Sequence, residues 1–213
     1  MRAFTRFLAA VLLMLGAGLV PAAGAADLKE GQDFRVIRPP LMADRERIEV
    51  VEFFWYGCPH CFDLEPPLAA WAASLPAGVS FRRVPAIPAN DKWLPGARLY
   101  YTLEAMGLAD KLHFEVFAAI HVGRQRIDDE KSIFEWAAKK GLDSQQFLAA
   151  WSSPGVQSRV RQSRLLGAAA GLTGVPAVMV HGRYLVLARG SHEELLANID
   201  SLVARVRAEA GMR

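Results

Sequence analysis

The feature that most constrains the fold is a nearly continuous apolar stretch, residues 48–56, followed almost at once by the motif Cys58-Pro59-His60-Cys61. The stretch is rich in β-branched and aromatic residues, which is typical of a strand buried on both faces in the middle of a sheet. Gly57 ends the strand, and the cysteine motif opens a helix. Residues three apart on a helix lie on one face, so the two sulfur atoms can approach bonding distance. The sequence therefore predicts a central strand leading into a helix that begins with a cysteine pair.

The other strand and helix signals follow an order that implies an insertion. Strand patterns are found at residues 34–37, 79–86, 177–181 and 184–187. Helical spacing of apolar residues predicts helices over 94–106, 110–121, 129–140, 144–151 and 155–170, and a last helix from the cap Ser191 through Arg207. Pro66 and Pro67 are expected to kink or interrupt the helix that follows the cysteines. This is the order of a small α/β domain, residues 26–86 and 172–213, with a helical insertion, residues 87–171.

The first 25 residues are expected to lie outside the mature fold. Arg2 and Arg6 give a basic start, residues 7–20 are uncharged and apolar, and residues 23–25 are small, which is the pattern of a signal peptide cleaved before Ala26. The alternatives are a buried helix and a retained membrane anchor. The strongly apolar part is about 14 residues long, whereas a membrane-spanning helix needs roughly 20. Export is therefore the favoured interpretation.

Composition limits the class of partner. Apolar residues make up 52% and charged residues 22% of the 213-residue chain, which is typical of a soluble domain with a core and argues against disorder. Lys and Arg number 25 against 22 Asp and Glu, and removal of Arg2 and Arg6 would leave 23 against 22. A charge so close to balance gives no reason to expect nucleic acid or an anionic membrane as partner.

The two cysteines favour redox chemistry over a structural role. A disulfide that stabilises an exported domain normally closes a long loop, because a longer loop constrains the unfolded chain more. A Cys-x-x-Cys pair can also be half of a zinc site, but the sequence has no second cysteine pair. Its remaining histidines lack ligand spacing: His113, His121, His181 and His192. A structural disulfide and a structural metal are therefore the weaker interpretations.

The position of Cys58 at the start of a helix predicts a reactive thiol. Unpaired backbone N–H groups and the helix dipole favour negative charge there, and His60 can add a hydrogen bond or a positive charge. These influences lower the pKa of the thiol and make it a better leaving group. Cys61 lies further into the helix and is expected to be shielded. We therefore predict Cys58 as the exposed nucleophile and Cys61 as the resolving thiol.

These residues resemble the DsbA-type thiol:disulfide interchange proteins of the bacterial periplasm. Residues 51–61, Val-Glu-Phe-Phe-Trp-Tyr-Gly-Cys-Pro-His-Cys, are similar to the family's active-site strand and helix start, and residues 174–177, Gly-Val-Pro-Ala, to its cis-proline loop. The helical block between them matches the family's inserted domain. The resemblance implies an α/β, thioredoxin-like fold with an inserted all-helical domain, and a strongly oxidising cysteine pair with a low thiol pKa.

The resemblance also implies roles for residues outside the cysteines. Pro59 and His60 belong to the family's catalytic motif. Pro176 is expected to follow a cis peptide bond and to lie beside the cysteine pair, where backbone groups can pair with an extended substrate. Val175, just before it, matches the family's specificity position.

Glu52 matches a buried acid that assists proton transfer near the second cysteine. A carboxyl group buried there without a role or a partner would be costly. Some members of the family pair this acid with a lysine on the next strand, where this chain has Phe81, Arg82 and Arg83. The sequence leaves open whether Glu52 has a basic partner.

These features predict an enzyme of the periplasm that donates the Cys58–Cys61 disulfide to exported proteins through a mixed disulfide at Cys58. The resemblance implies reduced or unfolded exported proteins as substrates and a quinone-linked membrane protein of the DsbB type as the partner that reoxidises the pair. It implies no cofactor beyond the redox-active disulfide and no metal. A monomer is expected, because no separate association segment is visible.

Three alternatives stay open at this stage. A disulfide isomerase or reductase of the same fold would use the same cysteines, although such proteins commonly need a dimerisation domain or a reducing partner. A metal-binding module would use the cysteine pair as ligands and would carry stoichiometric zinc or copper. A glutathione-dependent transferase or isomerase can have the same insertion but generally lacks an intact Cys-x-x-Cys. The reduction potential of the pair separates an oxidase from a reductase.

Overall fold

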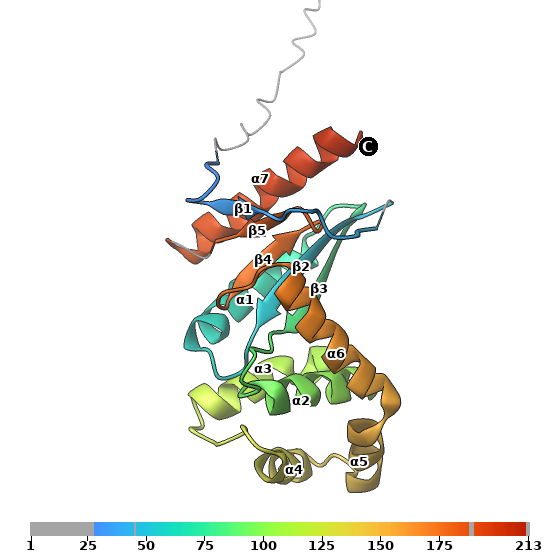
Figure 1. Cartoon of the computed structure of the whole chain (residues 1–213). Helices are drawn as coiled ribbons and strands as arrows, with labels where there is room; N and C mark the ends of the chain where they lie inside the picture. Colours follow the sequence, from blue (N-terminus) through green and yellow to red (C-terminus); the bar gives the residue numbers. More distant parts are fainter. Residues whose placement is uncertain (1–27, 45, 188–189, 212–213) are drawn as a thin grey trace, which may run out of the picture.

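A five-stranded mixed sheet forms the centre of the protein. The computed structural model describes residues 28–44, 46–187 and 190–211, so the expected signal peptide lies outside the described residues. The strand order is β1-β5-β4-β2-β3 (Figure 1), with bounds β1 Phe34–Val36, β2 Ile48–Phe54, β3 Val79–Pro85, β4 Ala177–Val180 and β5 Tyr184–Val186. β2 runs parallel to β3 and antiparallel to β4. The predicted strands are thus confirmed, each ending one or two residues earlier than expected, and β2 has a neighbour on both sides.

Helices cover both faces of the sheet. α1 (Pro59–Ala73) and α7 (His192–Ala210) pack on one face, and their side chains form a core with alternate residues of β2 such as Ile48 and Val50. Val51 and Phe53, which point the other way, meet the end of α6 (Pro154–Ala169) in a second core. This alternation explains why β2 reads as apolar almost throughout: both of its faces are buried.

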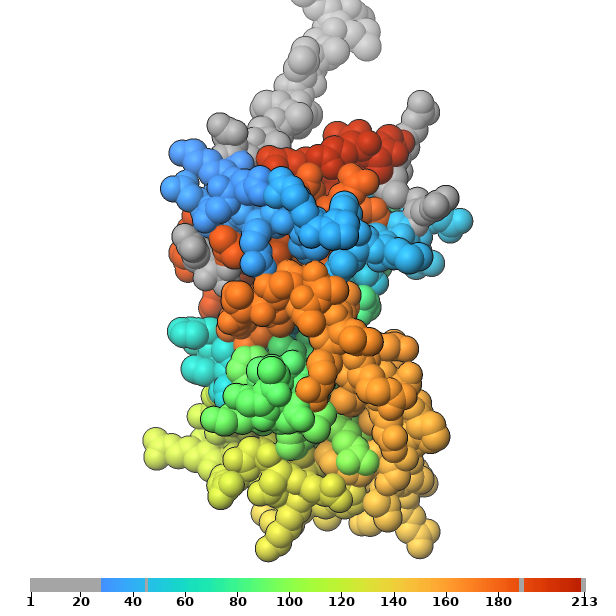
Figure 2. All heavy atoms as spheres, in the orientation of Figure 1, coloured from blue at the N-terminus to red at the C-terminus, as the bar shows by residue number. Residues whose placement is uncertain are grey.

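The helical insertion lies at one end of the sheet (Figure 1). It contains α2 (Leu94–Ala105), α3 (Ala109–His121), α4 (Glu130–Lys139), α5 (Ser144–Ser152) and α6. On the face seen in Figure 2, α6 lies between the blue N-terminal segment and the other helices of the insertion. Leu41 and Leu166 line a shared surface pocket. The predicted order of elements is confirmed, while the limits 87 and 171 stay a prediction. None of the helices described is long and apolar enough to cross a membrane.

Local capping explains where several helices begin. The side chains of four residues accept a hydrogen bond from the backbone N–H three residues further on: Asp129, Asp143, Ser153 and Ser191. The predicted cap of the last helix, Ser191, is therefore confirmed. That helix continues past the predicted end at Arg207 to Ala210, where Gly211 takes the left-handed conformation (φ 62°) that closes many helices.

Pro66 and Pro67 do not interrupt α1, so the predicted interruption is wrong, while the alternative of a kink stays a prediction. A proline inside a helix removes a backbone hydrogen bond and crowds the preceding turn, at a cost of about 3 kcal/mol or more. α1 nevertheless stays continuous from Pro59 to Ala73. The side chains of Cys61, Leu64 and Leu68 on its inner face are fully buried, so packing against the sheet outweighs the local cost.

Candidate active site

The cysteine pair lies just after β2, at the N-terminus of α1. Cys58 is the N-cap of α1 in extended backbone (φ −87°, ψ 115°), and Pro59 is at the start of the helix. A proline fits there because its missing N–H would have no partner in the first turn. Both cysteines carry free thiols. Cys58 is therefore the residue at the position where serine or aspartate usually caps a helix, but its own side chain makes no capping hydrogen bond.

The two thiols lie in opposite electrostatic environments. A hydrogen bond from the Cys61 thiol lowers the pKa of Cys58 to about 6, with smaller contributions from the backbone N–H groups of Cys61 and His60 and from the charge of His60. The same hydrogen bond, together with burial, raises the pKa of Cys61. Cys58 therefore ionises first, and near neutral pH the reduced pair holds one thiolate and one thiol.

The structure corrects the expected exposure of Cys58. Cys58 is only 6% exposed, and Cys61 is fully buried. Cys58 is covered because it packs into the core shared with the helical insertion and because its Sγ lies 3.5 Å from the carbonyl oxygen of Val175. The predicted order, with Cys58 more accessible than Cys61, agrees with these values.

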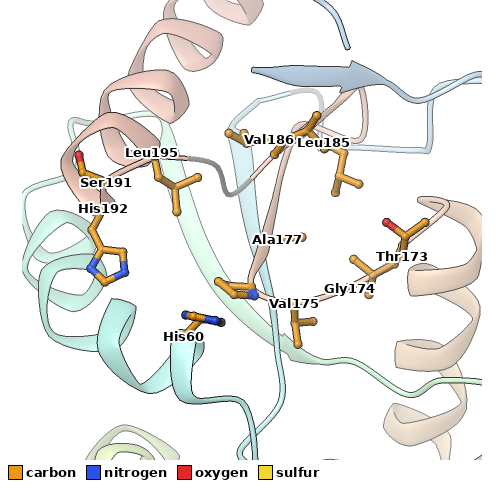
Figure 3. A pocket seen from close by; sticks show the side chains of 14 residues that line it. His60, Thr173, Gly174, Val175, Ala177, Leu185, Val186, Ser191, His192 and Leu195 are labelled. Atoms are coloured by element: carbon orange, nitrogen blue, oxygen red, sulfur yellow. The ribbon is translucent and has the colours of Figure 1, made fainter. Parts of the chain in front are cut away.

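The Val175 carbonyl belongs to the loop before β4, and the Val175–Pro176 peptide bond is cis, as the resemblance implied. A surface pocket of about 440 Å³ opens beside this loop. In Figure 3, His60 of α1 and His192 of α7 lie on one side of the pocket, and Thr173 lies on the other. An extended chain that reaches Cys58 would therefore have the loop and this pocket next to it.

Glu52 lies on the face of β2 that α1 covers, two residues after Val50. Its side chain is fully buried, and neither carboxylate oxygen has a hydrogen-bond partner among the residues described. Burial and, to a lesser extent, the charge of Glu65 raise the pKa of Glu52 to about 8. Near neutral pH this carboxyl group therefore holds a proton that it can exchange.

Arg83 is the basic partner that the sequence left open. β3 pairs with β2 in a register that puts Arg83 directly beside Glu52, and the guanidinium Nε lies 3.4 Å from the Glu52 Oε2. Arg82 points to the opposite face of the sheet, where it pairs with Glu49 at 2.7 Å.

Two buried polar residues near Glu52 were missed by the sequence interpretation. Glu65 contacts Arg83 from α1, and His113 contacts Glu65 from α3. The spacing of Glu65, one helical turn after Cys61, could have placed it on the buried face. No comparable signal marks His113, because its position depends on how α3 packs against α1. Within the described part of the chain, no three His, Cys, Asp or Glu side chains are grouped to hold a metal ion.

Comparison with known proteins decides the family. The model of the family described as "DSBA-like thioredoxin domain" matches residues 68–199, a stretch that begins just after the cysteine motif. The chain belongs to the DsbA-like thioredoxin family. Its similarity to individual DsbA proteins includes the motif, since a "Thiol:disulfide interchange protein DsbA" of Bordetella parapertussis is 40% identical over 208 residues, which cover 96% of this chain and 97% of the relative. The DsbA of Azotobacter vinelandii is 38% identical over 85% of this chain and 86% of its own length.

Solved DsbA structures share the fold. The crystal structure of Pseudomonas aeruginosa DsbA superimposes with a TM-score of 0.81 at 34% identity, covering 87% of this chain and 97% of that one. DsbA of Xylella fastidiosa gives a TM-score of 0.78 at 33% identity over 85% of this chain and 98% of that one. The family resemblance and the thioredoxin-like fold with a helical insertion are therefore confirmed.

Proposed function

We propose that this protein is a thiol:disulfide oxidoreductase that donates the disulfide between Cys58 and Cys61 to reduced exported proteins. The observation that carries the proposal is the position of Cys58, at the N-cap of α1 and within 3.5 Å of the Val175 carbonyl. A helix N-terminus stabilises a thiolate, so the reduced form is favoured and the disulfide becomes a strong oxidant. Membership of the DsbA-like family supports the same activity.

The transfer takes two steps. A substrate thiolate attacks the Sγ of Cys58, which forms a mixed disulfide and breaks the Cys58–Cys61 bond; the electron pair of that bond leaves on Cys61, which takes up a proton. A second substrate thiolate then attacks the substrate sulfur of the mixed disulfide. The substrate disulfide forms, and Cys58 leaves as a thiolate. The low pKa of Cys58, about 6, favours the second step because a more acidic thiol is a better leaving group.

The neighbouring residues have distinct roles in this proposal. His60 and the backbone N–H groups around it stabilise the Cys58 thiolate, and Pro59 starts the helix without leaving an unpaired N–H. Val175 and Pro176 present the backbone against which an extended substrate pairs. Residue 175 also carries a side chain beside the pocket and adjusts which substrates and partners fit.

Glu52 exchanges a proton with Cys61 in this proposal. During substrate oxidation its carboxyl group supplies the proton that the leaving Cys61 thiolate needs, and during reoxidation the carboxylate takes that proton back. A pKa of about 8 allows both directions near neutral pH. Arg83, 3.4 Å away, stabilises the carboxylate once the proton has left.

The remaining assignments are part of the same proposal, and membership of the DsbA-like family supports them. The protein acts in the periplasm, after removal of the signal peptide expected in residues 1–25, and works as a monomer on reduced or unfolded exported proteins. A quinone-linked membrane protein of the DsbB type restores the disulfide. The dithiol–disulfide pair itself carries the electrons, and nucleic acid takes no part.

The reduction potential tests this function. The Cys58–Cys61 pair is titrated against glutathione redox buffers, and the fraction oxidised is followed. We expect a potential well above that of thioredoxin, which is about −270 mV, because the Cys58 thiolate stabilises the reduced form. A potential near or below that value would indicate a reductase, even though the fold and both cysteines would be unchanged.

A further inference from the structure

A side chain of the insertion holds the turn that leads from β2 into Cys58. The backbone N–H of Cys58 donates to the carbonyl oxygen of Trp55 at 2.9 Å, so residues 55–58 form a β-turn with Tyr56 and Gly57 at its centre. The Nε2 of His121, the last residue of α3, lies 2.8 Å from the Tyr56 carbonyl oxygen. Because a carbonyl oxygen can only accept, Nε2 carries the proton and donates it. The insertion therefore contacts the backbone two residues before Cys58.

The peptide group between Tyr56 and Gly57 has two orientations open to it. Neither residue has a positive φ, which fits a type I turn, whereas a type II turn needs a positive φ at its third residue. That third residue is Gly57, and glycine reaches positive φ without a steric cost. Rotation of the central peptide to type II would turn the Tyr56 carbonyl away from His121. The hydrogen bond from His121 therefore favours the type I orientation.

Close packing, and not the geometry of the turn, accounts for the glycine at position 57. A Cβ atom on Gly57 would lie 2.3 Å from the ring of Trp55, which is closer than real side chains approach. The Trp55 ring is itself stacked on Trp93, with centroids 4.7 Å apart. A larger residue would displace this stack, so the turn keeps the conformational freedom of glycine. The restraint on the turn comes from outside it, through His121.

Packing holds the His121 ring where it can donate. The ring is stacked on that of Phe62 in α1, with centroids 5.1 Å apart and planes inclined by 15°, and it lies 6.1 Å from the ring of Phe117. The exposed ring of Phe114 is stacked on Phe62 as well, at 5.7 Å. A ring that packing already restrains loses little further freedom when it donates a hydrogen bond.

The restraint matters most when the cysteines are reduced. A disulfide fixes the distance and the orientation of the two cysteine side chains, so it ties Cys58 to α1 covalently. The reduced pair lacks this tie, and the thiolate of Cys58 depends on the Cys61 thiol and on backbone N–H groups at the start of α1. The turn must hold Cys58 toward those donors. A contact that stabilises the reduced form more than the oxidised form raises the reduction potential.

We propose that His121 is a positioning residue that raises the reduction potential of the Cys58–Cys61 pair by holding the Tyr56–Gly57 peptide in one orientation. The proposal deepens the proposed function and rests on it, because a disulfide donor needs a high potential. His121 acts through the backbone of the turn and takes no part in making or breaking bonds. The insertion thus tunes the oxidant as well as forming a wall of its site.

Two substitutions separate the hydrogen bond from the aromatic ring. His121→Phe keeps a ring against Phe62 and removes the donor. It should shift the equilibrium with glutathione toward the oxidised protein by about fivefold, which corresponds to a potential about 20 mV lower. It should also raise the pKa of Cys58, which the ultraviolet absorbance of the thiolate follows. His121→Gln loses the ring but keeps an N–H donor, and it should retain the original potential.

The stability of the two redox forms distinguishes positioning from a purely structural role. His121→Phe should lower the free energy of unfolding of the reduced protein more than that of the oxidised protein. In the reduced variant, the Gly57 amide should show a second NMR signal or exchange broadening as the peptide rotates. An equal loss of stability in both forms with an unchanged potential would overturn the proposal. If His121→Phe does not fold, His121→Leu takes its place with the same expected results.

Phe114→Leu is the matched control. It removes the exposed ring from the stack on Phe62 and leaves His121 with its hydrogen bond, so its potential should equal that of the unchanged protein. A potential lowered as much in Phe114→Leu or in His121→Gln as in His121→Phe would assign the effect to the stacked rings and overturn the proposal.

The unchanged protein separates this proposal from the proposed function. A potential near that of thioredoxin would refute the proposed function, whatever the variants show. A high potential that every variant shares would refute only the role of His121.

Discussion

Single residues give the two thiols their different properties. Cys58 and Cys61 are neighbours on one helical turn, yet a hydrogen bond between them lowers the pKa of the first and raises that of the second. The backbone N–H groups of the first turn act on Cys58 alone. The asymmetry that the chemistry needs, one thiolate that attacks or leaves and one thiol that keeps its proton, is therefore built into the start of a single helix.

The low pKa of Cys58 predicts a pH-dependent stability of the reduced protein. A thiol whose folded pKa is about 6, below the usual value of about 8.5, stabilises the fold fully above about pH 8.5 and loses this contribution as the pH falls through about 6. The reduced protein should therefore gain stability over Cys58→Ser with rising pH, by up to about 1.4 kcal/mol per pH unit between those values. Urea denaturation of both proteins under reducing conditions measures the difference. A difference that does not change with pH would contradict the low pKa.

At the scale of secondary-structure elements, the ends and the buried faces of helices determine how the site is assembled. The N-termini of α1 and α7 both border the pocket beside the cis-proline loop (Figure 3). α1 begins with cysteine and proline, whereas α7 begins with a serine that caps the helix through its hydroxyl group. The continuous course of α1 through Pro66 and Pro67 shows that a buried face can override two helix-breaking residues.

The α7 cap gives a prediction for the stability of that element. The Ser191 hydroxyl oxygen accepts a hydrogen bond from the Glu194 N–H at 3.1 Å. Ser191→Ala should lower the free energy of unfolding by about 1 kcal/mol, because a first-turn N–H loses its partner. Ser191→Asp should retain most of the stability, since its carboxylate can accept the same bond. Chemical denaturation measures both changes, and equal stability of Ser191→Ala and the original protein would show that the cap contributes nothing.

The whole molecule is held together by cores that cross the boundary between the sheet and the insertion. The largest contains Phe54, Tyr56 and both cysteines together with apolar residues of the inserted helices. Phe117 of α3 is fully buried at its centre, with its ring 5.9 Å from that of Phe54 and 5.0 Å from that of Tyr56. The insertion is therefore part of the wall of the active site.

This shared core predicts that the described part of the protein unfolds as one cooperative unit. Phe117→Ala should lower stability by about 3–5 kcal/mol, because it leaves a cavity among buried rings, and should keep a single transition. Phe117→Leu should cost much less, since it preserves most of the volume. Circular dichroism and tryptophan fluorescence follow the two proteins during urea unfolding. Two separate transitions in the Phe117→Ala protein would show that the insertion and the sheet are independent.

The sequence itself determined the order of elements and the family. The apolar run of β2, the cysteine motif and the later Val175-Pro176 pair are local patterns, and each can be read within a few residues. For the same reason the helices of the insertion, whose apolar spacing is regular, were predicted nearly to their ends. The predicted break at Pro66 and Pro67 was wrong because the compensating force is packing against the sheet, which involves residues distant in the sequence.

Only the tertiary structure decided the surroundings of the buried acid. The register of β2 with β3 puts Arg83, and not Arg82, beside Glu52, and the packing of α3 against α1 brings His113 to Glu65. The tertiary structure also makes Cys58 much less exposed than the motif suggested. A change of register by one residue would turn Arg83 to the opposite face of the sheet. The sequence therefore determined which groups carry the redox chemistry, whereas the surroundings of Glu52 depend on contacts between segments far apart in the chain, because strand register and helix packing alone set those distances.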